Sequence, residues 1–281
     1  MKQRPSFPAQ LERAGDRPVP AVKAVTKVQA LDLAPAAASK LGRPAPVVGA
    51  RAPARTVVPA RTPAHGDFAA VRTNMVAKIA AQGVVDATVL AAMSQVERHR
   101  FVDSALHAQA YEDTSLPIGL GQTISKPGVV ARMLELLRKQ RPGLLGRVLE
   151  IGTGCGYQAA VLSLLASEVY SMERLRGLHD RARENLRPLR LANLHLLFGD
   201  GMAGFAKGAP YAGIIAAAGG EAVPQAWTDQ LAVGGRLVAP VAMAVGAHTQ
   251  QVLVVIDKTA RGLRQSVHEA VHFVPLNSGL A

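Results

Sequence analysis

Residues 147–162 read Arg-Val-Leu-Glu-Ile-Gly-Thr-Gly-Cys-Gly-Tyr-Gln-Ala-Ala-Val-Leu, and this stretch decides the fold. A β-rich run stops at Gly152, glycines recur at alternate positions, and a helix-like run begins at Tyr157. Glycine tolerates positive φ and lets a ligand approach the backbone. The pattern predicts a strand, a tight turn and a helix whose first N–H groups favour an anionic group.

The glycine spacing indicates which ligand this turn would hold. Gly152, Gly154 and Gly156 form G-x-G-x-G, whereas turns that bind dinucleotides have G-x-G-x-x-G. The difference favours S-adenosylmethionine (SAM), which would place its carboxylate, and not a pyrophosphate, over the turn. A strand-to-helix turn that merely needs small residues is the alternative.

Two acidic residues follow later strands, where further cofactor contacts are expected. Glu173 ends the predicted strand 168–173, and a carboxylate there can accept both ribose hydroxyls of an adenosine. Asp200 follows the predicted strand 194–198 between two glycines and could bind the adenine amino group. A solvated charge and a turn aspartate are the respective alternatives. The three sites together favour a SAM pocket more than any one of them does.

The hydrophobic periodicity predicts the rest of the body. Early strands and helices alternate, whereas the last strands follow one another without helices. This order predicts an α/β, Rossmann-like SAM-dependent methyltransferase fold with a mostly parallel central sheet and antiparallel strands at its C-terminal end. Ligands bind such sheets at the carboxyl ends of the strands. We expect helices at 67–81, 87–96 (with Asp86 as N-cap), 129–137 (beginning near Pro127), 157–166, 175–189 and 224–231, and strands at 147–151, 168–173, 194–198, 212–217, 235–240, 250–257 and 265–273.

Residues 1–65 differ in composition from the rest of the chain. They contain 10 of the 18 prolines, with 11 lysines and arginines against 3 aspartates and glutamates, so most of the net charge of +12 lies there. Such a segment cannot bury enough apolar surface to offset the entropy of ordering. We expect a disordered basic extension over 1–65 and one methyltransferase domain over 66–281. A basic segment can attract nucleic acid or anionic membrane, but a solvated extension without a specific partner is the simpler expectation.

Cysteine usage and hydropathy bear on the compartment. Cys155 is the only cysteine, which excludes an internal disulfide and fits a reducing, cytoplasmic compartment. Its place inside the glycine turn predicts a small filler and not a nucleophile. No apolar run near the N-terminus has the length of a signal peptide or a membrane span. We expect a monomer without a membrane partner.

Residues 268–272, His-Glu-Ala-Val-His, match the zinc-protease pattern H-E-x-x-H. That pattern needs a helix, so that both histidines share a face. Here apolar and polar residues alternate and Pro275 follows, which predicts a strand. Two histidines four residues apart on a strand lie roughly 13 Å apart, too far for one zinc ion. We therefore expect no metal.

A Gly- and Pro-punctuated loop precedes the glycine turn, and composition alone assigns it no substrate. Residues 116–127 read Leu-Pro-Ile-Gly-Leu-Gly-Gln-Thr-Ile-Ser-Lys-Pro, and residues 271–276 read Val-His-Phe-Val-Pro-Leu. Long loops in compact domains are usually functional. Together with the Val-Leu-Glu-Ile-Gly-Thr-Gly-Cys-Gly-Tyr-Gln run at 148–158, these segments resemble the protein-L-isoaspartate O-methyltransferase family over roughly residues 68–276.

The resemblance implies an activity and a set of site residues. SAM would donate a methyl group to the α-carboxyl of L-isoaspartyl residues in damaged proteins and peptides, leaving S-adenosyl-L-homocysteine. Ser125 would be the catalytic residue. The cofactor would contact Thr123, Ile124, Glu150, Gly152, Thr153, Gly154, Gly156, Glu173, Asp200 and Gly201. The substrate would contact Leu116, Pro117, Ile118, Gly119, Val274 and Pro275.

One segment departs from the family pattern. After the fourth strand the family often has a Thr and a Pro-Pro pair, whereas residues 216–221 here read Ala-Ala-Ala-Gly-Gly-Glu. This loop borders the expected site, so substrate preference or loop rigidity would differ there.

The chemistry of a carboxyl acceptor agrees with the absence of an obvious general base. A free α-carboxyl has a pKa near 3.3–3.7, so it is ionised at pH 7 and needs only to be positioned. A hydroxyl such as that of Ser125 suits this task, although Ser125 could instead cap the helix that begins at Pro127. Two rival functions are methylation of nucleic acid and a non-enzymatic scaffold. The Asn/Asp-Pro-Pro-aromatic run common in amine methylation is missing after Ile215, and the intact glycine turn argues against a scaffold.

Overall fold

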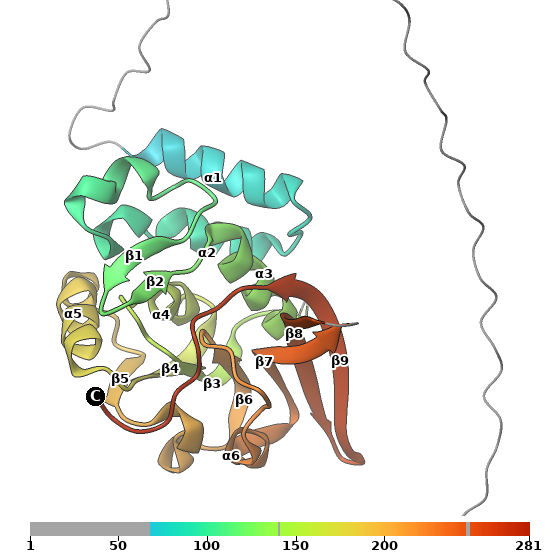
Figure 1. Ribbon diagram of the computed structural model, residues 1–281. Coiled ribbons are helices and arrows are strands. Elements are labelled where there is room, and N and C mark those ends of the chain that lie inside the picture. The colour runs from blue at the N-terminus through green and yellow to red at the C-terminus, as the bar shows by residue number, and fades with distance from the viewer. Residues whose placement is uncertain (1–67, 140, 246–247) are drawn as a thin grey trace, which may run out of the picture. The chain divides into compact units, whose positions relative to one another are not determined.

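The computed structural model describes residues 68–139, 141–245 and 248–281 (Figure 1). The predicted extension over residues 1–65 lies outside the described residues. Within the described part, a seven-stranded sheet packs against helices on both faces, and a small two-stranded hairpin stands apart from it. No helix of the described part is both long and apolar enough to cross a membrane.

The central sheet has the predicted arrangement. Its order is β5-β4-β3-β6-β7-β8-β9, with parallel pairing from β5 to β7 and antiparallel pairing from β7 to β9. The chain runs outward from β3 to β5 and then crosses back to β6, so the order reverses between β3 and β6. The strands are β3 (Leu145–Ile151), β4 (Ala166–Glu173), β5 (Leu194–Phe198), β6 (Tyr211–Ala216), β7 (Leu231–Val245), β8 (His248–Thr259) and β9 (Gly262–Val271).

The strands bury alternate residues in two separate cores, which explains their nearly continuous apolar sequences. Val148 and Ile215 contribute to the core beneath the larger helical layer, whereas Leu149 and Ile214 contribute to the opposite core, which contains Trp227. A two-residue period places these neighbours on opposite faces.

The larger layer contains most of the helices. They are α1 (Ala69–Ala81), α2 (Ala87–Gln95), α3 (Pro127–Arg138), α4 (Tyr157–Ser163) and α5 (Arg176–Leu186), while α6 (Gln225–Gln230) lies on the other face. Asp86 caps α2 as predicted, because its side chain accepts hydrogen bonds from the backbone N–H groups of Thr88 and Val89.

Several boundaries differ from the sequence prediction. The helix predicted at 157–166 ends at Ser163, because Ala166 already pairs with Leu145 as the first residue of β4. The helix predicted at 175–189 ends at Leu186 and continues as the 3₁₀ turn η3 (Arg187–Leu189). Pairing with β8 extends β7 well beyond the predicted 235–240. Tertiary pairing here overrides local helix propensity.

The predicted loop between α2 and α3 is more ordered than expected. It contains the 3₁₀ turns η1 (Arg98–Phe101) and η2 (Ser104–Gln109), then an antiparallel pair, β1 (Leu116–Gly119) and β2 (Gln122–Ile124). Arg181 on α5 donates to the carbonyl oxygen of Ile118 at 2.8 Å, which holds this β1–β2 hairpin against the body. Two further 3₁₀ turns, η4 (Gly201–Ala203) and η5 (Ala206–Gly208), follow β5.

Candidate functional site

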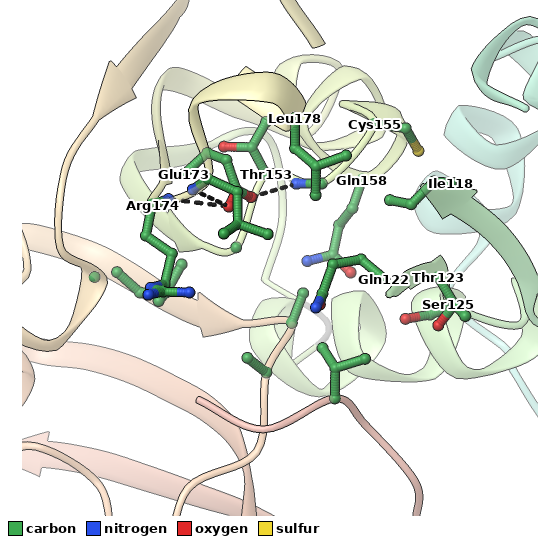
Figure 2. A pocket seen from close by; sticks show the side chains of 18 of the residues that line it. Ile118, Gln122, Thr123, Ser125, Thr153, Cys155, Gln158, Glu173, Arg174 and Leu178 are labelled. Carbon is green, nitrogen blue, oxygen red and sulfur yellow. Dashed lines mark hydrogen bonds between the residues drawn. The ribbon is translucent and has the colours of Figure 1, made fainter. Parts of the chain in front are cut away.

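A cleft of about 880 Å³ opens at the carboxyl ends of β3, β4 and β6, where the strand order reverses (Figure 2). This is the usual ligand position in a doubly wound sheet. The hairpin, the glycine turn, the end of β4 and a segment after β9 all contribute to its wall. The lining residues are Ile118, Gln122, Thr123, Ile124, Ser125, Val130, Ile151, Gly152, Thr153, Gly154, Cys155, Tyr157, Gln158, Met172, Glu173, Arg174, Leu175, Leu178, Gly201, Ala217, Ala218, Val274, Pro275, Leu276 and Asn277.

The glycine turn requires its glycines for conformation and for space. Gly152, Gly154 and Gly156 have φ values of 89°, 57° and 93°, which L side chains rarely adopt. A Cβ at Gly156 would also lie 2.8 Å from the Leu186 side chain. Gly152 and Gly154 line the cleft, whereas Gly156 lies behind it as the first residue before α4.

Glu173 closes the turn from the neighbouring strand. Its carboxylate accepts hydrogen bonds from the backbone N–H groups of Gly154 at 2.9 Å, Arg174 at 2.9 Å and Leu175 at 3.0 Å. The residue is only 5% exposed yet lines the cleft. Because each carboxylate oxygen has more than one lone pair, Glu173 can still accept from a ligand hydroxyl. Figure 2 shows Glu173 on one side of the cleft and the hairpin residues Thr123 and Ser125 on the other.

Glu150 lies one layer behind the turn and does not line the cleft. It is fully buried, and burial raises the pKa of its carboxyl to about 8, although a hydrogen bond from the Ser171 hydroxyl opposes the shift. The Ser171 hydroxyl also contacts the Thr153 hydroxyl at 2.6 Å, and Thr153 does line the cleft. Glu150 is therefore connected to the cleft through Ser171 and Thr153.

Asp200 also lies outside the cleft wall, while its neighbour Gly201 lines it. The two Asp200 carboxylate oxygens accept from the N–H of Met202 at 2.9 Å and the N–H of Gly279 at 2.7 Å. A Cβ at Gly201 would lie 2.5 Å from Ile151, so this close approach requires glycine. Asp200 thus fastens the C-terminal segment beside the cleft.

The hairpin supplies the opposite wall. Ile118, Thr123, Ile124 and Ser125 line the cleft, whereas Leu116, Pro117 and Gly119 lie on the same hairpin outside it. The N-cap residue of α3 is Lys126, and no side chain caps that helix, so Ser125 does not act as the cap. Among the described residues the Ser125 hydroxyl has no hydrogen-bond partner and is free to bind a ligand.

The segment after β9 completes the site. Val274 and Pro275 line the cleft, followed by Leu276 and Asn277. Gly219 belongs to the loop 216–221 that departs from the family pattern, and it holds this segment. Its N–H donates to the carbonyl of Val274 at 2.9 Å, and its carbonyl accepts from the N–H of Leu276 at 2.8 Å. The unusual loop and the predicted substrate segment are therefore joined by backbone pairing.

Several lining residues had not been predicted from sequence. Gln158 was quoted within the family-like run, and its buried Nε2 has no hydrogen-bond partner. Arg174 follows Glu173, and its Nε donates to the carbonyl of Gly279 at 2.7 Å. Leu178 and Gln122 enter the wall only because α5 and the hairpin meet there. Sequence periodicity does not predict which elements contact one another in this way.

The cleft fits SAM in the features that this ligand requires. The turn permits close backbone approach, and Glu173 offers carboxylate oxygens at the strand end. Burial raises the pKa of the Cys155 thiol, which agrees with the expected filler role.

The H-E-x-x-H segment lies on β9 and after it, as predicted. Glu269 pairs with Arg132 at 2.7 Å, and the His268 ring contacts the Ser266 hydroxyl. In the part of the chain that the structure describes, no group of three or more His, Cys, Asp or Glu side chains could hold a metal ion.

Comparisons with known proteins point to one family. The profile of the family described as protein-L-isoaspartate(D-aspartate) O-methyltransferase matches residues 70–281. A Leptothrix cholodnii protein named protein-L-isoaspartate O-methyltransferase is 64% identical over 228 residues, which cover 80% of each chain. A protein of that name from Burkholderia ambifaria is 50% identical over 275 residues, covering 95% of this chain and 87% of its own.

Solved structures give the same picture. One named protein-L-isoaspartate O-methyltransferase has a TM-score of 0.66 at 28% identity, covering 74% of this chain and 67% of its own. A Plasmodium falciparum structure in complex with S-adenosyl-L-homocysteine has a TM-score of 0.62 at 24% identity, covering 73% of this chain and 98% of its own. The second supports the fold alone.

Proposed function

The chain belongs to the protein-L-isoaspartate(D-aspartate) O-methyltransferase family, and on that premise we propose which residues perform the reaction. The enzyme transfers a methyl group from SAM to the α-carboxyl of L-isoaspartyl residues in damaged proteins and peptides. Methylation of nucleic acid, the alternative weighed above, is not favoured. The observation that supports our residue assignment is the unpartnered Ser125 hydroxyl in the cleft, across from Glu173.

The cofactor half of the cleft is formed by the glycine turn and the strand ends. When bound, SAM supplies an electrophilic methyl group on a sulfonium. Gly152, Thr153 and Gly154 allow close backbone approach, and Glu173 accepts hydrogen bonds from the ribose hydroxyls. Gly201 leaves room for the adenine ring, and Asp200 holds the adjoining C-terminal segment. Thr123 and Ile124 close the cleft from the hairpin.

The substrate half is formed by the hairpin and the segment after β9. Ile118 and Ser125 lie on one side, and Val274 and Pro275 on the other. The Ser125 hydroxyl donates a hydrogen bond to the isoaspartyl carboxylate and orients one oxygen toward the methyl group. No residue needs to remove a proton, because the carboxylate is already ionised at neutral pH. Positioning and exclusion of water are the enzyme's contributions.

Ser125→Ala tests this assignment. Loss of one hydrogen bond to a carboxylate should lower turnover of an isoaspartyl peptide about tenfold or more, while SAM affinity stays the same. Ser167→Ala, on an exposed position of β4, is the control and should keep full turnover. The matching aspartyl peptide should not be methylated by any of the three proteins. Wild-type turnover by Ser125→Ala would refute the role of the hydroxyl.

The pH profile tests the same mechanism without a variant. With the carboxyl pKa near 3.5, the rate should stay flat between about pH 6 and 8. A steep rise through pH 7, or a trapped methyl-serine at Ser125, would require a base or a two-step transfer instead.

The remaining proposals are a monomer that works in the cytoplasm without a metal. The single buried thiol of Cys155 suits a reducing compartment, and an ionised acceptor needs no Lewis acid. Light scattering after gel filtration should give the monomer mass at all protein concentrations tested. Turnover should be unchanged after treatment with EDTA.

A further inference from the structure

Arg98 is a buried cation that no step described above uses. It lies in η1, it has no exposed surface, and no Asp or Glu of the described residues forms an ion pair with its guanidinium. Its Nε donates to the carbonyl of Ala110 at 2.8 Å, and its Nη2 donates to the carbonyl of Ser125 at 2.7 Å. Its Nη1 is buried and has no acceptor among the described residues.

A buried charge without a counter-ion is uncommon, because removing a charge from water costs several kcal/mol unless it is paired. Burial lowers the pKa of the Arg98 guanidinium, and the neighbouring Tyr157 and Cys155 side chains oppose this shift, followed by the through-space effect of Asp113. An arginine nevertheless stays protonated inside a protein. Neutral donors could satisfy the two carbonyls equally well, so hydrogen bonding alone does not account for a positive charge here.

The position of Arg98 connects this charge to the cleft. The guanidinium carbon lies 4.9 Å from the centroid of the Tyr157 ring, and Nη2 contacts the backbone of Ser125. Tyr157 and Ser125 line the cleft, whereas Arg98 does not. The positive charge therefore lies one layer behind the wall that we assign to the substrate carboxylate, in a region of low dielectric.

We propose that Arg98 is a positioning residue for the substrate, which holds the backbone of Ser125 in place and attracts the isoaspartyl carboxylate through its uncompensated charge. The inference rests on the proposed function, because it takes that carboxylate as the ligand beside Ser125. The anion that Arg98 lacks within the protein is then supplied by the substrate.

The charge should act on binding more than on the chemical step. During transfer a bond forms between the carboxylate oxygen and the methyl carbon, and the electron pair of the carbon–sulfur bond stays on sulfur. The anion and the sulfonium cation both become neutral, so a fixed positive charge stabilises the bound carboxylate more than the transition state. Loss of Arg98 should therefore raise KM for the peptide by a larger factor than it lowers kcat.

The decisive measurement compares two inhibitors that differ only in charge. One is an isoaspartyl peptide with its free α-carboxylate, and the other is the same peptide with a primary carboxamide at that position. The wild-type protein with SAM analogue bound should prefer the carboxylate about tenfold or more, as expected for a charge a few ångströms behind the wall. Arg98→Met and Arg98→Gln should lose most of this preference, and Arg98→Lys should retain it.

Phe101→Leu is the matched control for disturbed packing. Phe101 contacts the same Tyr157 ring at a centroid distance of 5.6 Å but carries no charge. Phe101→Leu should weaken the binding of both inhibitors by the same factor and keep the preference for the carboxylate. If the neutral variants of Arg98 do likewise, Arg98 has only a structural role and the inference is wrong.

If the neutral variants do not fold, the wild-type measurement alone can still overturn the inference. Equal affinity of wild-type protein for carboxylate and carboxamide would overturn the inference, and a strong preference for the carboxylate would support it. Methylation of isoaspartyl peptide by the wild type is tested first. Without it the proposed function fails, whereas turnover combined with an unchanged preference in the variants refutes only the role of Arg98.

Discussion

At the scale of single residues, two glutamates at neighbouring strand ends have different environments. Glu150 and Glu173 are both nearly inaccessible to solvent. Glu173 accepts three backbone hydrogen bonds and lines the cleft, whereas Glu150 accepts a hydrogen bond from the Ser171 hydroxyl and lies behind the cleft wall. Glu173 is therefore placed to accept hydrogen bonds at the cleft, whereas burial favours the protonated form of Glu150.

Glu150→Gln should change how stability depends on pH. Burial raises the pKa of Glu150 to about 8, so the folded protein keeps a proton that the unfolded chain releases above about pH 4.3. The contribution of protonated Glu150 to the free energy of unfolding is fully present below about pH 4.3. It is lost as pH rises toward 8, by up to about 1.4 kcal/mol per pH unit. Urea denaturation at pH 5, 6.5 and 8 should show that the free energy of unfolding of the variant increases relative to that of the wild type as pH rises.

The half-buried carboxylate of Glu168 on β4 provides the control for this experiment. It is hydrogen-bonded to Arg147, which lowers its pKa, so the sign of its linkage is opposite. Glu168→Gln should therefore show no gain with rising pH. Parallel curves for Glu150→Gln and the wild type would mean that Glu150 is ionised in the folded protein.

Glu173→Ala should weaken cofactor binding. Each lost hydrogen bond to a carboxylate contributes about 1.5–3 kcal/mol, so the dissociation constant for SAM should rise about tenfold or more. Isothermal titration calorimetry of SAM measures it directly. Glu168→Gln again serves as the control and should keep wild-type affinity, and unchanged affinity in Glu173→Ala would remove Glu173 from the cofactor site.

At the scale of elements, the loop 216–221 and β8 both hold the segment after β9 through hydrogen bonds. The Gln251 side chain accepts from the N–H of Phe273 at 2.7 Å and donates to its carbonyl at 3.2 Å. A Cβ at Gly219 would lie 2.5 Å from the Gln251 amide nitrogen. Gly219 therefore leaves room for the Gln251 side chain, which holds the backbone of Phe273 at the start of the segment after β9.

Gly219→Ala should displace the Gln251 amide and loosen residues 274–276. We expect a raised KM for isoaspartyl peptide with SAM affinity unchanged, because the cofactor half of the cleft does not depend on this contact. Steady-state kinetics of Gly219→Ala, Gln251→Ala and the double variant form a cycle. If Gly219 acts through Gln251, the double variant should be no worse than Gln251→Ala, whereas additive losses would show independent effects.

At the scale of the whole molecule, the folded body is expected to be self-sufficient. Its two cores are formed by described residues from Met75 to Phe273. The composition of residues 1–65 offers little apolar surface to add to them. The extension does have a counterpart in the Burkholderia ambifaria relative, whose match covers 95% of this chain.

A chain that starts at Gly66 should keep the melting temperature and the peptide turnover of the full-length protein. Differential scanning calorimetry and steady-state assays of the two proteins side by side check this. A lost or broadened melting transition in the shorter chain would show that the extension packs on the body.

Features that depend on local sequence pattern could be predicted before the structure was known. The glycine turn, the placement of Glu173 after β4, the cap at Asp86 and the strand nature of residues 268–271 could all be predicted. Each rests on backbone conformations special to glycine, on capping chemistry or on a two-residue period, and these act over a few residues. The parallel order of the sheet followed from the alternation of strands and helices.

Only the tertiary structure decided which side chains meet across long sequence separations. Arg98 reaches Ser125, Asp200 holds Gly279, and Gln251 clamps Phe273. The same packing places Glu150 behind the cleft, although the family resemblance implied a direct contact with the cofactor. These meetings depend on how helices and strands pack in three dimensions, and no local periodicity encodes that packing. The local pattern thus specified the glycine turn, and the packing brought the hairpin and the segment after β9 to the same cleft.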